Sequence, residues 1–267
     1  GRAQDGSGSR GRRTRSVSVP VPHSRSVGLL DADPVAAGSN DAAAAGTAPV
    51  DRPIVLASGS RYRAQLLADA GIPVEVMAPD VDERALDHRL DAVGPDGLAV
   101  ELALLKAAAV APRCVGRIVV AADQVGVLAE PSGRWRMLTQ KSEPAAAVEQ
   151  LTALSGRRHH LLNGVVVLDE AGDAHIGIDV QVVQMRRFGR TEAESYVERF
   201  EPFDTSGSYR LEDGEAFERD AGPGSALVEW VRGEHASGVL GLPLPLLGRL
   251  LDDARGRGPT HGRPRSG

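Results

Sequence analysis

The sequence predicts an α/β fold in which a mixed β-sheet is flanked by helices, and three observations carry this prediction. Residues 118–122 form an unbroken apolar run, which is typical of a central strand buried on both faces. Apolar residues recur at helical spacing over residues 98–111, which predicts a helix with one buried stripe. Residues 159–168 and 174–187 form two β-rich runs around a Gly-containing turn, so an antiparallel hairpin joins the alternating strands and helices.

We expect a single folded domain at residues 53–254, between two disordered tails. Residues 1–52 are mostly Gly, Ser, Arg, Ala, Pro and Asp, and residues 255–267 have the same character. Such segments bury too little apolar surface to offset the entropy of the chain. Residues 1–28 carry six Arg and one Asp, which fits either an organellar transit peptide or a spurious extension from a GC-rich reading frame, and we favour the extension.

The first elements of the domain surround a loop with the layout of a phosphate site. Residues 54–56 suit a short buried strand, and a helix is expected from Arg61 to residue 70. Ser58 and Ser60 lie between them, where the free N–H groups of the helix point at the loop and Arg63 adds positive charge. Taken alone, the segment fits an ordinary serine N-cap even better than a phosphate site.

An acidic turn and a lysine come next. A second strand is expected at residues 74–77, followed by an acidic stretch at residues 79–83 that ends in Glu83. This stretch is either a magnesium site, which needs one or two carboxylates, or a solvated turn. Lys106 borders the buried stripe of the helix at residues 98–111, so its ammonium group either extends to water or reaches into a site.

Asp123 and Gln124 follow the central strand, which we expect to stop at residue 122. Ligands of open α/β sheets bind beyond the carboxyl ends of the strands, so Asp123 is a candidate functional carboxylate. Residues 125–128 either continue the strand or begin a hairpin.

The second half of the chain supplies the remaining helices and strands. A helix is expected from an N-cap at Ser142 to Leu154, with Lys141 directly before it. In the hairpin, Ile176, Ile178, Val180 and Val182 alternate and are predicted to form one buried face. The other expected elements are a helix opened by a capping box at residues 191–194 and ending near 200, a polar loop at 201–209, a strand at 226–232 and a helix at 245–254.

Composition argues against several classes of protein. Cys114 is the single cysteine, so no intramolecular disulfide can form. No apolar run approaches the ~18 residues of a membrane span, so we expect a soluble, cytoplasmic protein without a membrane partner. Aromatic residues make up 3% of a chain with a net charge of −5, which argues against a nucleic-acid partner. The seven histidines lack the spacing of zinc ligands.

Short motifs follow one another in a characteristic order. They are Leu56-Ala57-Ser58-x-Ser60, Tyr62-Arg63, Asp82-Glu83, Lys106 in an Ala-rich helix, Ala122-Asp123-Gln124-Val125, Leu154-Ser155-Gly156, Glu201-Pro-x-Asp204, Gly207-x-Tyr209 and Gly241-Leu242-Pro243-Leu244. In content and order, the chain resembles the Maf-like nucleoside triphosphate pyrophosphatases over nearly all of residues 53–252.

The resemblance implies a fold, a reaction and a cofactor. The implied fold is the one shared by Maf proteins and inosine triphosphate pyrophosphatases. The implied reaction is hydrolysis of a nucleoside triphosphate between its α and β phosphates, with Mg²⁺ or Mn²⁺ as the divalent cation. A homodimer is also compatible with the resemblance. The implied roles are phosphate binding for Ser58, Ser60 and Arg63, metal binding for Glu83, general base or metal ligand for Asp123, and charge stabilisation for Lys106 and Lys141.

Two positions indicate a branch of the family. The branch that acts on thymidine and uridine triphosphates usually has Asp-Thr after the central strand and a Gln in the late motif. This chain has Asp123-Gln124 and Glu212 instead, which look like the 7-methyl-GTP pyrophosphatase branch. A carboxylate such as Glu212 suits a base ring made cationic by methylation. We therefore expect Gln124 and Glu212 to bind the substrate.

Departures from the family pattern keep other functions open. Arg61 stands where the family usually has Pro, Gln140 and Ser142 replace the usual Gly and Pro on either side of Lys141, and residues 129–138 lengthen a normally short hairpin. The alternatives are a dTTP/UTP-type pyrophosphatase and a catalytically weakened nucleotide-binding protein that acts by interaction in cell-division control. Nucleic-acid binding through the basic ends ranks last.

Overall fold

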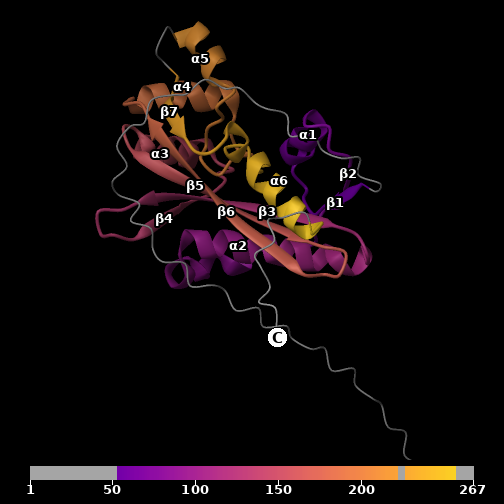
Figure 1. Cartoon of the computed structure of the whole chain (residues 1–267). Coiled ribbons are helices and arrows are strands. Elements are labelled where there is room, and N and C mark those ends of the chain that lie inside the picture. The colour runs from indigo at the N-terminus through magenta and orange to yellow at the C-terminus, as the bar shows by residue number, and fades with distance from the viewer. Residues whose placement is uncertain (1–52, 222–225, 257–267) are drawn as a thin grey trace, which may run out of the picture. The chain divides into compact units, whose positions relative to one another are not determined.

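A mixed sheet of seven strands forms the centre of the computed structural model, which describes residues 53–221 and 226–256 (Figure 1). The predicted α/β fold with a mixed sheet is therefore confirmed. The tail predicted at residues 1–52, and all but two residues of the one predicted at 255–267, lie outside the described residues.

The sheet is parallel at one edge and antiparallel across the rest. Its strand order is β2-β1-β3-β5-β6-β7, and β4 pairs with β3 beside this path. Strand β1 runs parallel to β2 and β3, whereas all other pairs are antiparallel. The strands are β1 (Ile54–Leu56), β2 (Val74–Val76), β3 (Val119–Ala129), β4 (Trp135–Leu138), β5 (Arg158–Leu168), β6 (Ala174–Met185) and β7 (Val228–Arg232).

Strand β3 has an open stretch of edge in its middle. On one side it pairs with β1 only as far as Val120 and with β4 only from Gly126 onward. Residues 121–125 therefore face no other described strand on that side, while β5 pairs with β3 along its opposite side. The end of the strand at residue 122 was wrong and its continuation through residues 125–128 is confirmed, because β5 carries the ladder through Asp123 and Gln124 to Val127. The open edge lies inside the strand and not beyond its end.

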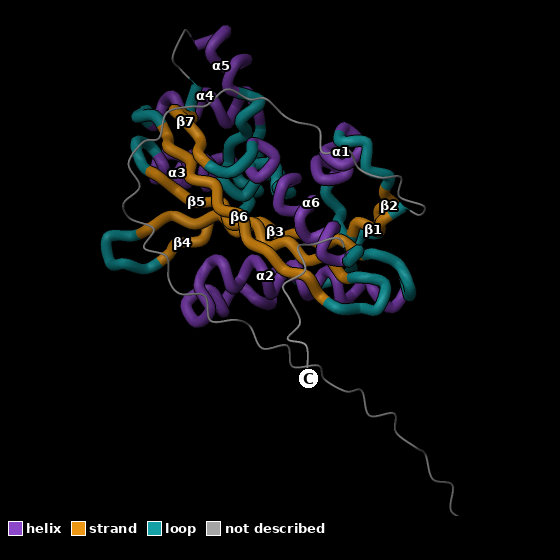
Figure 2. Tube along the Cα trace, in the orientation of Figure 1, coloured by secondary structure: helices purple, strands orange, loops and turns teal. Residues whose placement is uncertain are grey.

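Helices cover both faces of the sheet (Figure 2). Helix α2 packs on β3 and β5 from one side. Helices α1 and α6 share a core with β1 and β3 on the other side, where α3 and α4 pack over β5 and β6. The helices are α1 (Arg61–Asp69), α2 (Leu90–Val110), α3 (Pro144–Leu154), α4 (Arg190–Phe200), α5 (Gly214–Ala221) and α6 (Leu244–Ala254), with short 3₁₀ segments η1 (Glu83–Arg89), η2 (Ala111–Arg113) and η3 (Ala236–Gly238).

Helix α2 begins earlier than its apolar periodicity indicates. Its first turn is separated from the rest by Gly94, whose φ of 74° is left-handed, and Pro95 follows at the start of the regular helix. Arg89 donates two hydrogen bonds to Glu101, at 2.7 and 2.6 Å, and so holds the end of η1 against the body of α2. The acidic turn is thus fixed to the helix that carries Lys106.

Two predicted helix caps were wrong. Glu143, not Ser142, occupies the N-cap of α3 and makes no side-chain cap bond. Gly189 occupies the N-cap of α4, and the acids of the supposed capping box instead pair with arginines. Both helices begin close to the predicted residues, whereas β4 and α5 were not predicted.

The buried face of β6 is the opposite of the one predicted. Ile176 and Ile178 are 36% and 39% exposed, whereas Asp179 and Gln181 are buried. The polar pair is buried because Asn163 and Gln181 each donate to the Asp179 carboxylate, at 2.9 Å. A hydrogen-bonded polar network therefore replaces apolar packing at this point of the sheet.

Candidate active site

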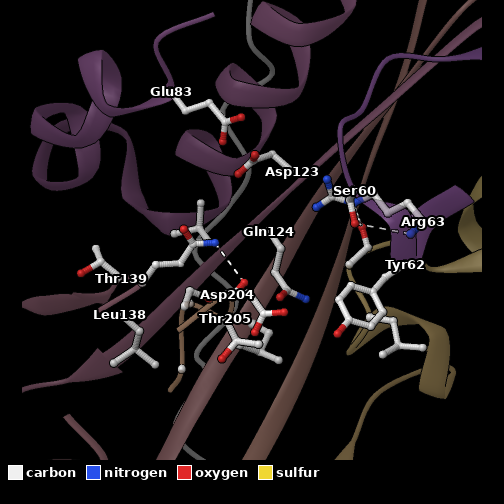
Figure 3. Close-up of a pocket in the computed structure, with 18 of the residues that line it drawn as sticks. Ser60, Tyr62, Arg63, Glu83, Asp123, Gln124, Leu138, Thr139, Asp204 and Thr205 are labelled. Atoms are coloured by element: carbon white, nitrogen blue, oxygen red, sulfur yellow. Dashed lines mark hydrogen bonds between the residues drawn. The ribbon is translucent and has the colours of Figure 1, made fainter. Parts of the chain in front are cut away.

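A cleft of about 680 Å³ opens beside the unpaired stretch of β3 (Figure 3). Its walls come from the loop between β1 and α1, from η1, from the segment after β4, and from the loops at residues 204–212 and 239–241. Because neighbouring residues of a strand point to opposite faces, Asp123 faces α2 and Gln124 faces η3. The gap between β1 and β4 thus lets both faces of the sheet contribute to one cleft.

The loop after β1 is both a helix cap and an arginine anchor. The buried hydroxyl of Ser58 accepts from the N–H of Ser60 at 3.1 Å and from Nη1 of Arg63 at 3.3 Å. Ser60 is the N-cap of α1 and accepts from the N–H of Arg63 at 3.5 Å. Nε of Arg63 donates to the carbonyl of Gly241 at 2.9 Å. The structural and phosphate-binding interpretations of this loop are therefore compatible, since the same contacts aim the guanidinium at the cleft.

Lys106 lies between two carboxylates at the centre of the cleft. Its Nζ is 2.9 Å from Oε1 of Glu83 and 2.5 Å from Oδ1 of Asp123. Lys106 and Asp123 are each 5% exposed, whereas half of the Glu83 side chain is exposed. Buried charges are tolerated when they are paired and hydrogen-bonded, which holds this lysine in place. Its ammonium group has not extended to water but lies against the two carboxylates in the cleft.

Arg63 adds a second cation to this group. Burial lowers the pKa of its guanidinium, and the negative charges of Asp123 and Glu83 oppose that shift. Four ionised groups thus share one wall of the cleft, with two positive and two negative charges. Such a wall can bind an anion through its cations and still hold a carboxylate close to the bound group.

The two carboxylates can provide part of a divalent cation site. Within residues 53–221 and 226–256, no cluster of three or more His, Cys, Asp or Glu side chains has the arrangement of a metal site. Mg²⁺ commonly binds one or two carboxylates and takes its other ligands from water and phosphate oxygens. Glu83 and Asp123 fit such a site only if bound substrate or water completes the coordination.

Gln124 holds a loop of the cleft wall. Its Nε2 lies 3.1 Å from Oδ1 of Asn163, 3.0 Å from the carbonyl of Gly238 and 3.1 Å from the carbonyl of Val239. Asn163 also donates to the carbonyl of Gly238, at 2.8 Å. Gln124 lines the cleft as predicted, but its amide nitrogen is used to fix the loop at residues 239–241 and is not left for a substrate.

The opposite end of the cleft is less charged and is formed by two facing segments. Leu138 and Thr139 line one side, and residues 204–207 line the other. In Figure 3, Leu138 and Thr139 lie across Gln124 from Ser60 and Arg63. Glu212 is exposed and also lines the cleft. We call this region the distal end, defined by Leu138, Thr139, Gln140, Asp204, Thr205, Ser206, Gly207 and Glu212.

Arg61 has a contact that proline could not make. Its guanidinium carbon lies 5.2 Å from the centre of the Tyr62 ring, and both residues line the cleft. A side-chain hydrogen bond with Tyr62, together with the charge of Tyr62, raises the pKa of Arg61. Arg61 thus adds a third cation beside the loop that follows β1.

Lys141 is not brought to the cleft wall. Its Nζ donates to Oγ1 of Thr139 at 2.7 Å, and Thr139, not Lys141, lines the cleft. The other predicted site residues, Ser58, Ser60, Arg63, Glu83, Lys106, Asp123, Gln124 and Glu212, all line it. Lys141 therefore meets the cleft wall through its hydrogen bond to Thr139, and its catalytic role stays a prediction.

Sequence reasoning missed Gln150 and Arg210. Gln150 interrupts the buried stripe formed by Ala147, Leu151 and Leu154 in α3, and that interruption was the one available signal. Arg210 lines the cleft and pairs with Asp204. It lies in a polar loop without periodicity, where the sequence offers no signal for an ion pair.

Comparison with known proteins places the chain in a family. The model of the family described as Maf-like protein matches residues 53–254. The chain belongs to the Maf-like protein family. A 7-methyl-GTP pyrophosphatase of Nitrosococcus oceani is 33% identical to this Maf-like protein over 77% of its chain and 95% of the relative. A nucleoside triphosphate pyrophosphatase of Rhodopseudomonas palustris is 35% identical, over 74% and 93% of the two chains.

Relatives named for other substrates also match the Maf-like protein. A dTTP/UTP pyrophosphatase of Symbiobacterium thermophilum is 36% identical over 72% of the chain and 88% of the relative. A solved nucleoside-triphosphatase / dITP/XTP pyrophosphatase of Mycobacterium abscessus aligns with 64% of the chain and 93% of its own, at 14% identity and a TM-score of 0.29, which is too low to argue from. In the part of the chain that the structure describes, no helix has the length and apolar character needed to cross a membrane.

Proposed function

We propose that this Maf-like protein hydrolyses nucleoside triphosphates between the α and β phosphates and releases a nucleoside monophosphate and pyrophosphate. The observation that carries the proposal is the buried position of Lys106 between Glu83 and Asp123, on the same wall as Arg63 and its serine-capped loop. The names of the relatives that match more than two thirds of the chain support the same reaction class.

The arrangement can perform this reaction by positioning and charge stabilisation. The triphosphate would bind with its phosphates against Arg63, Lys106 and the loop after β1. Water attacks the α phosphorus, the bond from that phosphorus to the bridging oxygen breaks, and pyrophosphate leaves with the bond's electron pair. Asp123 takes the proton of the attacking water as general base, and the two cations stabilise the charge that develops on the leaving group.

A divalent cation, Mg²⁺ or Mn²⁺, would be held by Glu83 and Asp123 and would neutralise further charge on the phosphates. The oxygen donors of these two residues suit such a hard cation. Lys106 already contacts both carboxylates, so water and substrate oxygens would supply the remaining coordination. The cytoplasmic location of the protein and its assembly into a homodimer stay predictions from the sequence.

We further propose 7-methyl-GTP, or a similarly modified nucleotide, as the preferred substrate. Methylation at N7 makes the guanine ring cationic, and the distal end carries the carboxylates of Glu212 and Asp204. Asp204 is paired with Arg210, so Glu212 is the carboxylate better placed to meet a cationic ring. Relatives with 7-methyl-GTP and with dTTP/UTP in their names both match the chain, which makes the dTTP/UTP type the competing possibility.

A panel of nucleotides tests both the proposed reaction and the proposed substrate. The full chain is incubated with Mg²⁺ and with 7-methyl-GTP, GTP, ATP, UTP and dTTP, and pyrophosphate and monophosphate are measured separately. Release of pyrophosphate from any of them supports the reaction, and the highest kcat/KM for 7-methyl-GTP supports the substrate. A clear preference for dTTP or UTP would overturn the substrate alone. Tight nucleotide binding without turnover would instead favour the catalytically weakened binding protein.

A further inference from the structure

The cleft has a phosphate end and a distal end with different chemistry. At the first, Arg63 and Lys106 lie with the carboxylates of Glu83 and Asp123 beside the loop after β1. At the distal end, Arg210 is paired with Asp204, and the carboxylate of Glu212 lies among backbone and hydroxyl groups. A triphosphate bound at the charged end would place its base toward the distal end, so the distance between Thr139 and the loop at 204–208 decides which base fits.

The buried amide of Gln150 connects these two distal walls. Its Oε1 accepts from the N–H of Thr139 at 3.3 Å, and its Nε2 donates to the carbonyl of Thr139 at 3.1 Å. The same nitrogen lies 2.8 Å from the carbonyl of Ser206 and 2.8 Å from Oγ of Ser208. Gln150 is 8% exposed and does not line the cleft, so it acts from behind the wall.

The loop that Gln150 holds has an unfavourable backbone conformation. Ser208 has a φ of 58° and Glu201 a φ of 44°, a left-handed region in which residues other than glycine are strained. Ser208 is fully buried, and Gln150 contacts its hydroxyl directly. Strained loops keep their shape only when surrounding contacts determine it, and here the amide of Gln150 supplies contacts to both Ser206 and Ser208.

We propose that Gln150 is a positioning residue that sets the width of the distal end and thereby the selectivity of the enzyme among nucleobases. This proposal rests on the proposed function, since it assumes a nucleotide whose base lies at the distal end. It assigns no contact between Gln150 and the substrate. Gln140 adds a second wall-to-wall bond, from its Nε2 to the carbonyl of Asp204 at 3.0 Å, but that bond is at the surface. The buried link is therefore the one that determines the spacing.

The first test replaces Gln150 with methionine, which has a similar length and no strong hydrogen-bonding group. The ratio of kcat/KM for 7-methyl-GTP to that for UTP should change by a factor of ~10 or more, mainly through KM, because the walls lose their fixed spacing. The kcat for the better substrate should stay within about threefold, since Lys106 and Asp123 are untouched. An unchanged ratio in folded Gln150→Met would overturn the proposal.

The matched control is Ser155→Ala, at the C-cap of α3, the helix that carries Gln150. Ser155 donates to the carbonyl of Phe188 at 2.7 Å and accepts from its N–H at 2.8 Å, away from the cleft. This substitution also removes buried hydrogen bonds and should lower the melting temperature. The ratio of kcat/KM for 7-methyl-GTP to that for UTP should nevertheless equal that of the wild type. If this ratio changes as much in Ser155→Ala as in Gln150→Met, a general loss of stability changes the selectivity, and not the loss of the Gln150 amide.

The second test uses Gln150→Glu, which keeps the shape of the side chain. An ionised carboxylate has no donor and would face the carbonyls of Thr139 and Ser206, whereas a protonated one donates once and still accepts from Thr139. For this variant, the ratio of kcat/KM for 7-methyl-GTP to that for UTP is divided by the wild-type ratio at the same pH. This quotient should lie well below one at pH 8 and return toward one at pH 5.5. A quotient that does not vary with pH would contradict the positioning role.

Direct binding separates the two proposals. The affinities for 7-methyl-GTP and UTP are measured by calorimetry without added metal, for the wild type and each variant. A wild-type chain that binds nucleotides but releases no pyrophosphate refutes the proposed function, while its affinity ratio still tests Gln150. A wild type that is active, together with variants whose affinity and kinetic ratios both match it, refutes the role of Gln150 alone.

Discussion

Asp123 both pairs with Lys106 and is the proposed general base. Asparagine at this position keeps the size of the side chain but cannot take a proton from water. We expect Asp123→Asn to lower kcat by roughly 10²-fold or more, the usual size of a lost general base. Single-turnover release of pyrophosphate with a saturating nucleotide measures this step directly.

Asp91→Asn is the matched control for this substitution. Asp91 pairs with Arg134 at 2.5 Å, and both side chains are well exposed, so its loss should leave kcat within about twofold. Turnover of Asp123→Asn close to that of Asp91→Asn would remove Asp123 from the general-base role.

At single residues, the sequence located the charged groups of the site but not what holds them. Ser58, Arg63, Lys106 and Asp123 were found because the chemistry of phosphates needs hydroxyls, cations and a carboxylate. Gln150 was missed because a buried amide gains its meaning from Thr139 and Ser206, which are distant in the sequence. Lys141 was placed in the site because the family resemblance implies a lysine there, and one hydrogen bond to Thr139 accounts for where it lies.

Among the elements, the packing of α2 on β5 depends on one glycine. A Cβ on Gly164 would lie 2.4 Å from the backbone carbonyl of Ala99 in α2, and backbone cannot move aside as a flexible side chain can. Gly164→Ala should therefore push α2 outward and cost ~2 kcal/mol or more of unfolding free energy. Because Gly164 is the direct β5 partner of Asp123, the shift should also separate Lys106 from that carboxylate and lower kcat.

Gly248→Ala provides the comparison for this substitution. Gly248 lies in α6, and no heavy atom would come within 4 Å of an added Cβ. We expect this substitution to stabilise the protein by ~0.5–1 kcal/mol with unchanged kcat, because alanine favours the helix. Urea unfolding and kcat are measured for both variants. Equal stability of the two would show that α2 adapts to the methyl group without cost.

The elements show why part of the fold could be predicted. The apolar run at 118–122 and the hairpin at 159–187 were located because period and length suffice for buried strands. The face of β6 was misassigned because Asp179 and Gln181 are buried in hydrogen bonds with each other and with Asn163 of β5, which alternation cannot reveal. Strand β3 was ended too early for a related reason, since its continuation depends on pairing with β5.

At the scale of the whole molecule, the cleft lies within the region that the family model matches. The family model matches residues 53–254, and the cleft residues all fall in this range. The cleft nevertheless depends on long-range closure, because Arg63 near the start of the domain contacts Gly241 near its end. The motifs could predict which segments contribute, but only the sheet order shows that the gap beside β3 brings them together.

Stability of the whole fold should fall in acid partly through His159. This residue is fully buried on β5, and burial, aided by the neighbouring His160, lowers its pKa to about 3. Its Nε2 lies 2.7 Å from the hydroxyl of Tyr209, which lines the cleft. Because the folded pKa is below that of an unfolded histidine, ~6.5, only the unfolded chain takes up the proton as the pH falls through 6.5. Stability from this group is therefore complete above pH 6.5 and is lost progressively toward pH 3.

His159→Gln tests this linkage, because glutamine can reach the Tyr209 hydroxyl but does not titrate. Between pH 7 and 5.5, the unfolding free energy of the wild type should fall by ~1 kcal/mol more than that of the variant. Urea titrations of the full chain at both pH values measure the difference, and equal m-values show that the same unfolding is compared. His88→Gln is the matched control, since His88 is exposed and should follow the wild type. If His159→Gln loses as much stability in acid as the wild type, the acid sensitivity of the fold comes from groups other than this buried ring.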